Sequence, residues 1–220
     1  MCTNYKAPGE DPGISELKLG IGDLYRRDPW DLDVYPDYAA PIAYAAGDGM
    51  EVVKAVFGFW PNFMQPDRVD EAGKKRRKLD TVNARGEEVA EKRLYQRAWR
   101  DGQRCLIPAQ WIYEPCYETG KNVWHRIGVG GWQPYCVAGI WKRYADQDGR
   151  SLIGMSMLTV NADGHPVMFR MHKPNDEKRS VVILRPEDYD EWLHTKNIEA
   201  ARTMLLLYPA GEMAAEPAIS

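Results

Sequence analysis

Short apolar segments rich in β-branched and aromatic residues recur along this chain, and turns rather than long helical stretches separate most of them. Segments of this kind are typical of β-strands. The predicted strands cover residues 50–59, 104–108, 111–114, 135–141, 151–160 and 180–184. A regular alternation of strands with helices and a glycine-rich phosphate loop are both missing, which argues against a doubly wound parallel sheet. We therefore predict an α+β fold with a mostly antiparallel sheet or an open β-barrel and a few flanking helices.

Two segments have the pattern of helices. Residues 89–100 place Ala90, Leu94 and Ala98 at four-residue spacing among charged residues, and an Asp-Gly pair follows as a suitable end. Residues 186–193 begin with a proline and continue with two acidic residues, an order that suits the first turn of a helix.

The ends of the chain have little regular patterning. Residues 7–41 are rich in Pro, Gly and Asp, so we expect loops and short turns there. No linker divides the rest, and we expect a single domain over residues 1–208. The Ala/Glu/Pro-containing segment 209–220 is expected to be a mobile tail.

Charge and hydropathy limit the classes of partner. The formal net charge is −3, which argues against a protein that holds nucleic acid through bulk positive charge, although a local groove remains compatible with it. One basic run, residues 74–78 with Lys75 and Arg76 at its centre, is either a solvated loop or an edge that contacts phosphates. The chain has neither an apolar run of the roughly 18 residues that a membrane span needs nor a secretory signal. A cytoplasmic protein without membrane contact is expected.

The thiols and imidazoles do not form a metal-binding pattern. The 4 cysteines contain no CxxC pair, and the 4 histidines contain no HExxH or similar pairing. These spacings predict neither a zinc site nor a disulfide framework, so reduced thiols, no metal and no cofactor are expected.

The second residue is a cysteine, and removal of Met1 would leave Cys2 with a free amine and a thiol two carbons apart. Such an aminothiol condenses with an aldehyde to an imine, and the thiol then closes a thiazolidine ring. The usual pKa values, about 8 for an α-amine and about 8.5 for a thiol, make this chemistry accessible near neutral pH. The alternative is that a cysteine stands at this position without a function.

A series of short motifs, taken in order, resembles the SRAP family, the SOS-response-associated peptidases also called abasic-site processing proteins. The motifs are Met1-Cys2, Tyr-Ala-Ala-Pro at 38–41, Phe-Gly-Phe-Trp-Pro at 57–61, Asn-Ala-Arg-Gly-Glu at 83–87, Arg-Cys-Leu-Ile-Pro-Ala at 104–109, Tyr-Glu at 113–114, Ala-Gly-Ile-Trp at 138–141, Thr-Val-Asn-Ala at 159–162 and Arg-Met at 170–171. Together they extend over nearly all of residues 1 to 195.

The resemblance implies a function in the DNA damage response. It implies a fold around a cleft for single-stranded DNA, with the mature Cys2 at the floor of the cleft. Cys2 would capture the aldehyde of an abasic site as a covalent thiazolidine, and a lyase activity through the imine is possible. The peptidase in the family name refers to self-removal of Met1. We expect a monomer whose partner is abasic single-stranded DNA, associated with the nucleoid when bound.

Two further residues are predicted to act with Cys2. Glu114 would be the general acid and base, a role that favours a partly buried carboxyl with a raised pKa. Asn83 would orient the Cys2 amine or a sugar oxygen. The structural alternatives are a surface glutamate on a strand and an asparagine that begins a turn.

Arginines and aromatic residues are the predicted DNA contacts. Arg85 and Arg170 suit flanking phosphates, although an ion pair between Arg85 and Glu87 is an alternative for the first. Trp60 and Phe63 could stack on unpaired bases or belong to the core. Lys75 and Arg76 of the basic run complete the set.

The chain departs from the family pattern at several positions. Met168 stands where many members have a histidine, so either His165 or His172 would replace it, and His165 is the favoured one. Thr3 and Asn4 replace the family's glycine and arginine, which removes a cation that Lys6 or the basic run could offset. Pro115 follows Glu114 where a tryptophan is usual.

Two other functions compete with crosslinking. The first is a thiol hydrolase of the N-terminal-nucleophile type, in which the Cys2 amine activates its own thiol against a peptide or amide. The second is a DNA-binding module that keeps the fold and has lost catalysis, which the substitutions at positions 4 and 168 make worth testing.

Overall fold

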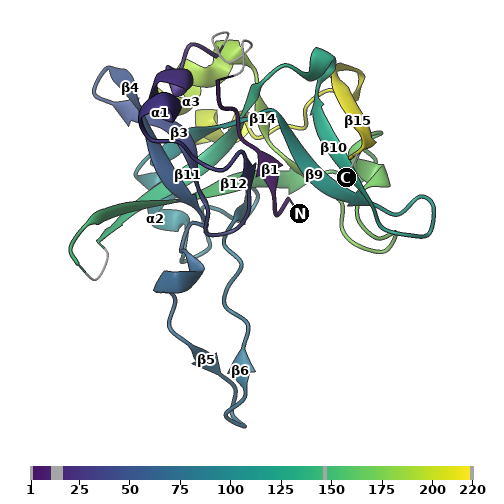
Figure 1. Ribbon diagram of the computed structural model, residues 1–220, viewed down its shortest axis with the longest axis horizontal. Helices are drawn as coiled ribbons and strands as arrows, with labels where there is room; N and C mark the ends of the chain where they lie inside the picture. Colours follow the sequence, from purple (N-terminus) through teal and green to yellow (C-terminus); the bar gives the residue numbers. More distant parts are fainter. Residues whose placement is uncertain (1, 11–16, 146–147, 219–220) are drawn as a thin grey trace.

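The computed structural model describes residues 2–10, 17–145 and 148–218 of the 220-residue chain (Figure 1). Its centre is an eight-stranded sheet. Five of the strands pair in a closed ring, in the order β12-β4-β3-β8-β11 and back to β12. The ring strands are β3 (Ala39–Ala46), β4 (Gly49–Phe57), β8 (Arg104–Ala109), β11 (Tyr135–Ala145) and β12 (Ser151–Asn161). The ring is therefore a small barrel, and only the β12–β4 pair in it is parallel.

Three short strands extend the barrel at its rim. β7 (Asn83–Arg85) pairs with β12 in parallel, β13 (Arg179–Val181) pairs with β12 and β14 (Ile183–Leu184) pairs with β11. The inward side chains of the barrel are large and apolar, and Phe57, Ile42, Leu106 and Ile140 are fully buried. Burial of such side chains is the main stabilising term of the fold.

A second, five-stranded antiparallel sheet lies beside the barrel, in the order β15-β10-β9-β1-β2 (Figure 1). Its strands are β1 (Tyr5–Lys6), β2 (Asp33–Val34), β9 (Trp111–Cys116), β10 (Val123–Val129) and β15 (Met213–Pro217). In β9, burial alternates strictly, so that Ile112, Glu114 and Cys116 face inward. The period of two residues therefore places a carboxyl group on the buried face of a strand.

Short helices and one isolated hairpin complete the described residues. The α-helices are α1 (Ile21–Arg27), α2 (Gln96–Arg100), α3 (Tyr189–His194) and α4 (Ile198–Thr203). The 3-10 turns include η2 (Asn62–Met64), η3 (Gly130–Trp132), η4 (Met168–Arg170), η5 (Pro186–Asp188) and η6 (Ala210–Glu212). Strands β5 (Arg68–Val69) and β6 (Lys75–Arg76) pair only with each other, and their hairpin projects from the body of the molecule (Figure 1). None of the helices in this part of the chain is long and apolar enough to cross a membrane.

The predicted fold class is confirmed: the described chain is mostly antiparallel sheet with a closed barrel and a few short helices. All six predicted strand segments contain strands, with the segment 180–184 divided between β13 and β14. The segment 186–193 forms η5 followed by α3, as its proline and acidic residues indicated.

The helix predicted over residues 89–100 is shorter than expected. Only Gln96–Arg100 is helical, and the preceding residues form turns, with Glu91 and Tyr95 donating to carbonyls three residues earlier. The reason is tertiary packing. The turns let the chain bury both Val89 and Trp99 in the core, and this packing outweighs the helical pattern of the segment.

Both ends of the described chain contain more regular structure than their composition indicates. Residues 7–41 contain α1, β2 and the start of β3. Residues 213–217 of the expected mobile tail form β15, which pairs with β10 over five residues, and Arg126 binds Glu216 across this pair. Backbone pairing to a distant strand and this ion pair hold a segment whose own composition carries little strand signal.

Candidate active site

Cys2, Asn83 and Glu114 converge from three parts of the chain. Cys2 immediately precedes the β1 region, Asn83 begins β7 and Glu114 lies in β9. β1 pairs with β9 in the register Tyr5↔Ile112, which brings the start of the chain alongside Glu114. The Asn83 side-chain amide donates to the Cys2 carbonyl at 2.6 Å and fixes the other side of this start.

The Cys2 side chain is held inside the protein, with only 1% of the residue exposed. Its thiol donates to the Asn4 carbonyl at 3.2 Å. Burial raises the pKa of this thiol well above its usual range, and the Glu114 carboxylate raises it further. The thiol is therefore protonated near neutral pH, and its use as a nucleophile requires a base beside it.

Glu114 has the properties of such a base. The residue is 1% exposed, and burial raises the pKa of its carboxyl to about 7. A carboxyl with this pKa both gives and takes a proton at neutral pH, which is the requirement for general acid–base catalysis.

His172 is the partner of Glu114. Its Nε2 lies 3.2 Å from Glu114 Oε2, and burial lowers the pKa of the imidazole to about 4, with Lys178 contributing. The distance alone is compatible with an ion pair, but both pKa shifts favour the uncharged forms because neither charge is solvated. Between about pH 4 and 7 the pair therefore holds one proton, which lies on Glu114.

The backbone around His172 is held by a buried lysine. His172 has a left-handed conformation with φ of 63°, and its N–H donates to the Pro115 carbonyl at 2.6 Å. Lys178, 5% exposed, donates from Nζ to the carbonyls of Met171 at 2.8 Å and Lys173 at 2.7 Å. These contacts fasten the His172 turn to β9 beside Glu114.

Asn83 retains an open acceptor. Its Nδ2 is used by the Cys2 carbonyl, whereas its buried Oδ1 has no hydrogen-bond partner among residues 2–10, 17–145 and 148–218. A buried acceptor without a partner is costly, so this oxygen is suited to a donor on a ligand or on the mature amine.

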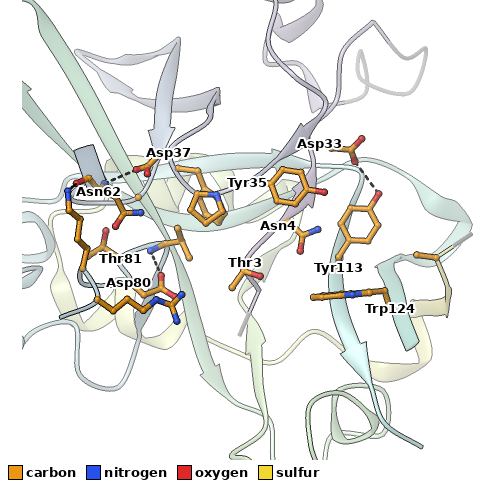
Figure 2. A pocket seen from close by; sticks show the side chains of 17 residues that line it. Thr3, Asn4, Asp33, Tyr35, Asp37, Asn62, Asp80, Thr81, Tyr113 and Trp124 are labelled. Atoms are coloured by element: carbon orange, nitrogen blue, oxygen red, sulfur yellow. Dashed lines mark hydrogen bonds between the residues drawn. The ribbon is translucent and has the colours of Figure 1, made fainter. Parts of the chain in front are cut away.

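A cavity of about 950 Å³ opens directly beside these groups. Its lining includes Thr3, Val82 and Tyr113, the chain neighbours of Cys2, Asn83 and Glu114. Figure 2 shows Thr3 between two walls, one with Asp37, Asn62 and Asp80 and one with Tyr113 and Trp124. The cavity is large enough for several groups of an extended ligand and has both polar and aromatic walls.

The structure places His172, and not the favoured His165, beside Glu114. The Nε2 of His165 lies 2.9 Å from the Tyr208 carbonyl, and its Nδ1 accepts from the Met168 N–H at 3.2 Å. Both ring nitrogens are used in backbone contacts, so His165 has a structural role. Met168, at the position of the family histidine, is fully buried.

The two predicted phosphate-binding arginines are in ion pairs. Arg85 binds Glu177 at 2.6 Å, not Glu87, and Arg170 binds Glu118 at 2.8 Å. Each arginine side chain is 40% exposed, so water screens these pairs and a phosphate can compete for the guanidinium.

The other predicted DNA contacts are spread more widely. Trp60 is half-buried beside the cavity residues, whereas Phe63 is 58% exposed. Lys75 and Arg76 lie in β6, on the projecting hairpin, and do not line the cavity. Lys6 binds Asp33 at 3.0 Å.

Sequence reasoning missed the aromatic lining of the cavity and the buried lysine. Tyr35, Tyr113 and Trp124 come from three distant segments, and nothing local in the sequence marks them as neighbours. Nothing in the sequence marks Lys178 as a buried residue, because lysines are rarely buried. In the described residues all four cysteines are free thiols, and no cluster of His, Cys, Asp or Glu suits a metal ion.

Comparison with known proteins agrees with this arrangement. The model of the SOS response associated peptidase (SRAP) family matches residues 1–219, so the chain belongs to this family. A crystal structure of a protein from Bordetella bronchiseptica is similar, with a TM-score of 0.80 and 30% identity over 100% of both chains.

Two relatives from Bacillus subtilis (strain 168) have names that state a function. The abasic site processing protein YobE is 28% identical over 61% of this chain, and the abasic site processing protein YoqW is 27% identical over 58% of it. The matched regions cover 59% and 54% of these relatives, respectively.

Proposed function

We propose that this protein captures abasic sites in single-stranded DNA as covalent adducts of Cys2. The observation that carries the proposal is the position of Cys2 beside the buried Glu114–His172 pair, next to a large cavity. The names of YobE and YoqW and membership of the SRAP family support DNA processing at abasic sites.

The chemistry begins with removal of Met1, which frees the Cys2 amine. The amine attacks the C1′ aldehyde of the opened deoxyribose and forms a C–N bond, and a proton from Glu114 leaves with the hydroxyl group as water. The resulting imine is then attacked by the Cys2 sulfur. The imine keeps its N–H proton when water leaves, so the thiol proton returns to the Glu114 carboxylate, and the product is a thiazolidine with the net loss of one water.

The surrounding groups suit these steps. A carboxyl with a pKa of about 7 can first donate and then accept a proton, and His172 Nε2, 3.2 Å from Glu114 Oε2, can orient this carboxyl. The open Oδ1 of Asn83 can accept from the amine or from a sugar hydroxyl. The same imine provides a branch to lyase chemistry, in which loss of a C2′ proton expels the 3′ phosphate.

Binding of the strand is assigned to two arginines and two aromatic residues that lie outside the cavity lining. Arg85 and Arg170 would exchange their exposed carboxylate partners for phosphates on either side of the lesion. Trp60 and Phe63 would stack on neighbouring bases, as aromatic side chains do in other single-strand binders.

Intact mass after incubation with abasic single-stranded DNA tests the proposal. Wild-type protein without Met1 should gain the mass of the oligonucleotide less one water and should survive denaturation. Cys2→Ala should form no stable adduct. Cys116→Ala is the matched control, because Cys116 is also a buried free thiol, and it should react like wild type.

Three outcomes would contradict the proposal. One is wild-type protein without an adduct, and another is an adduct of undiminished yield on Cys2→Ala. The third is peptide hydrolysis that requires Cys2 without any DNA adduct, which would favour a thiol hydrolase of the N-terminal-nucleophile type.

A further inference from the structure

The β5–β6 hairpin projects away from both larger sheets (Figure 1). We call residues 66–79 the arm. Its two strands pair only with each other, in the register Arg68↔Arg76 and Val69↔Lys75. An isolated two-stranded ribbon is marginally stable in water, so an extended arm of this kind gains little from the fold of its own chain.

The arm carries an excess of cations, with 6 Lys and Arg residues against 3 Asp and Glu residues. Arg68 and Arg76 are direct cross-strand partners, and like charges opposite each other destabilise a ribbon. Within the described part of the chain, neither of these arginines has an ion-pair partner, and the same holds for Lys74 and Arg77. Lys75 binds Asp67 at 3.3 Å, with both side chains well exposed, and such a pair is easily exchanged.

The cationic strip of the arm is continuous with the cavity. Arg77 and Lys78, which follow β6 directly, line the cavity wall, and Lys78 Nζ donates to the Asn62 carbonyl at 2.6 Å. Asn62 also lines the cavity, and the exposed ring of Phe63 follows it in η2. Phosphate-binding and base-stacking groups therefore follow one another from the cavity to the arm.

We propose that the arm binds the phosphate backbone of the DNA strand after it leaves the cavity, with Arg68 and Arg76 holding phosphates between them. A polyanion removes the like-charge repulsion of this pair, which no described residue of the chain does. The proposal rests on the proposed function for the identity of the ligand, and it extends the binding site beyond the nucleotides around the lesion.

The contribution of the arm to affinity should depend on the length of the oligonucleotide, whereas the contribution of the cavity should not. A short oligonucleotide of about 5 nucleotides fills the cavity, whereas one of about 20 also reaches the arm, given the site sizes of single-strand binders. Arg68→Gln/Arg76→Gln removes the cross-strand repulsion and should leave the ribbon at least as stable. Lys18→Gln/Lys196→Gln is the charge-matched control, because both lysines are exposed and lie outside the arm and the cavity.

Affinity should be measured by fluorescence anisotropy in the Cys2→Ala background, with oligonucleotides extended on the 5′ side only, on the 3′ side only and on neither side. We expect Arg68→Gln/Arg76→Gln to weaken binding of one extended oligonucleotide on the order of tenfold at low salt and to reduce its salt slope by about 1.4. Binding of the short oligonucleotide and all binding by the control variant should stay within twofold of the parent.

The outcomes separate the arm from the proposed function. An equal loss of affinity for short and extended oligonucleotides, or no loss of affinity for any of them, would overturn the proposed role of the arm. An affinity of the arm for an acidic peptide that exceeds its affinity for the oligonucleotides would assign it to a protein partner and overturn the proposal as well. Failure of the wild-type protein to form any covalent adduct would overturn the proposed function without affecting the measured role of the arm in binding.

Discussion

The two regions that we assign to DNA differ in their charged groups: charge is suppressed at the buried site and exposed on the arm. At the buried site, burial suppresses the charge of Glu114, of His172 and of the Cys2 thiol. On the arm, the cations are exposed to solvent. Arg68 and Arg76 are cross-strand partners, and neither forms an ion pair with a described residue. The difference suits the two proposed tasks, because proton transfer requires groups that change charge near neutral pH, whereas backbone binding requires charges that are permanent and exchangeable.

The comparison predicts that changes at the buried site act on rate and that changes at exposed cations act on affinity. Variants at the two regions therefore test whether the rate of adduct formation and the affinity for DNA can be changed separately.

Glu114→Gln should have the largest effect among variants that retain Cys2. The amide keeps the shape of the side chain but cannot transfer a proton, so the rate of adduct formation should fall by about 10²- to 10⁴-fold. Single-turnover gels with abasic DNA measure this rate, and the affinity in the Cys2→Ala background should not change. Glu91→Gln, at an exposed position, is the control, and a loss of affinity equal to the loss of rate would refute the division of roles.

Lys178→Met should have the next largest effect. The variant keeps the length of the side chain and removes the charged donor that holds the carbonyls of Met171 and Lys173. We expect the free energy of unfolding to fall by about 2–3 kcal/mol, because buried hydrogen bonds to a charged group are lost. Urea unfolding tests this, with Lys173→Met as an exposed control.

The same variant should slow adduct formation by about tenfold, since a loosened turn no longer holds His172 Nε2 at Glu114. Unchanged chemistry in a destabilised Lys178→Met protein would assign this lysine to stability alone.

The dependence of stability on pH should reveal the opposite pKa shifts of Glu114 and His172. His172, with a pKa lowered to about 4, is neutral in the folded state while the unfolded chain binds a proton below about 6.5. This term makes stability rise with pH between about 4 and 6.5. Glu114, with a pKa raised to about 7, has the opposite effect, because the folded state holds a proton that the unfolded chain loses above about 4.5.

The two terms nearly cancel in wild type, whereas Glu114→Gln keeps only the histidine term. The variant should therefore gain up to about 3 kcal/mol relative to wild type between pH 4 and 6.5. Urea midpoints across this range measure the difference. Parallel curves for the two proteins would mean that Glu114 and His172 do not have the shifted pKa values.

Arg85→Gln and Arg170→Gln should have the smallest effects. Each arginine gives up an exposed ion pair with a glutamate when it binds phosphate, so we expect affinity to fall only about threefold per variant and the salt slope to fall by about 0.7. Anisotropy in the Cys2→Ala background measures both quantities. A large loss of crosslinking rate without a change in salt slope would place these arginines in the chemistry instead.

The sequence predicted much of the fold because its strands carry local patterns. The segment 111–114 was predicted as a strand from its apolar and aromatic residues, whereas the alternation of burial that turns Glu114 inward is seen only in the structure. The strand β15 could not be predicted in this way, since its position depends on pairing with β10 and on the Arg126–Glu216 contact, both of which are non-local.

The site was predictable only where motifs marked it. Cys2 was named from its position after Met1, Asn83 and Glu114 were named from the family resemblance, and the structure brings the three together. The choice between His165 and His172 required the left-handed turn at residue 172 and the buried Lys178, neither of which leaves a pattern in the sequence.

The most direct test is to locate the adduct in the chain. Trypsin cleavage after Lys6 should release residues 2–6 with the nucleotide remnant attached and with Met1 absent. Mass spectrometry of this peptide, with fragment ions that keep the remnant on Cys2, is the result that we predict. A remnant on any other peptide, or on a peptide that retains Met1, would contradict the account.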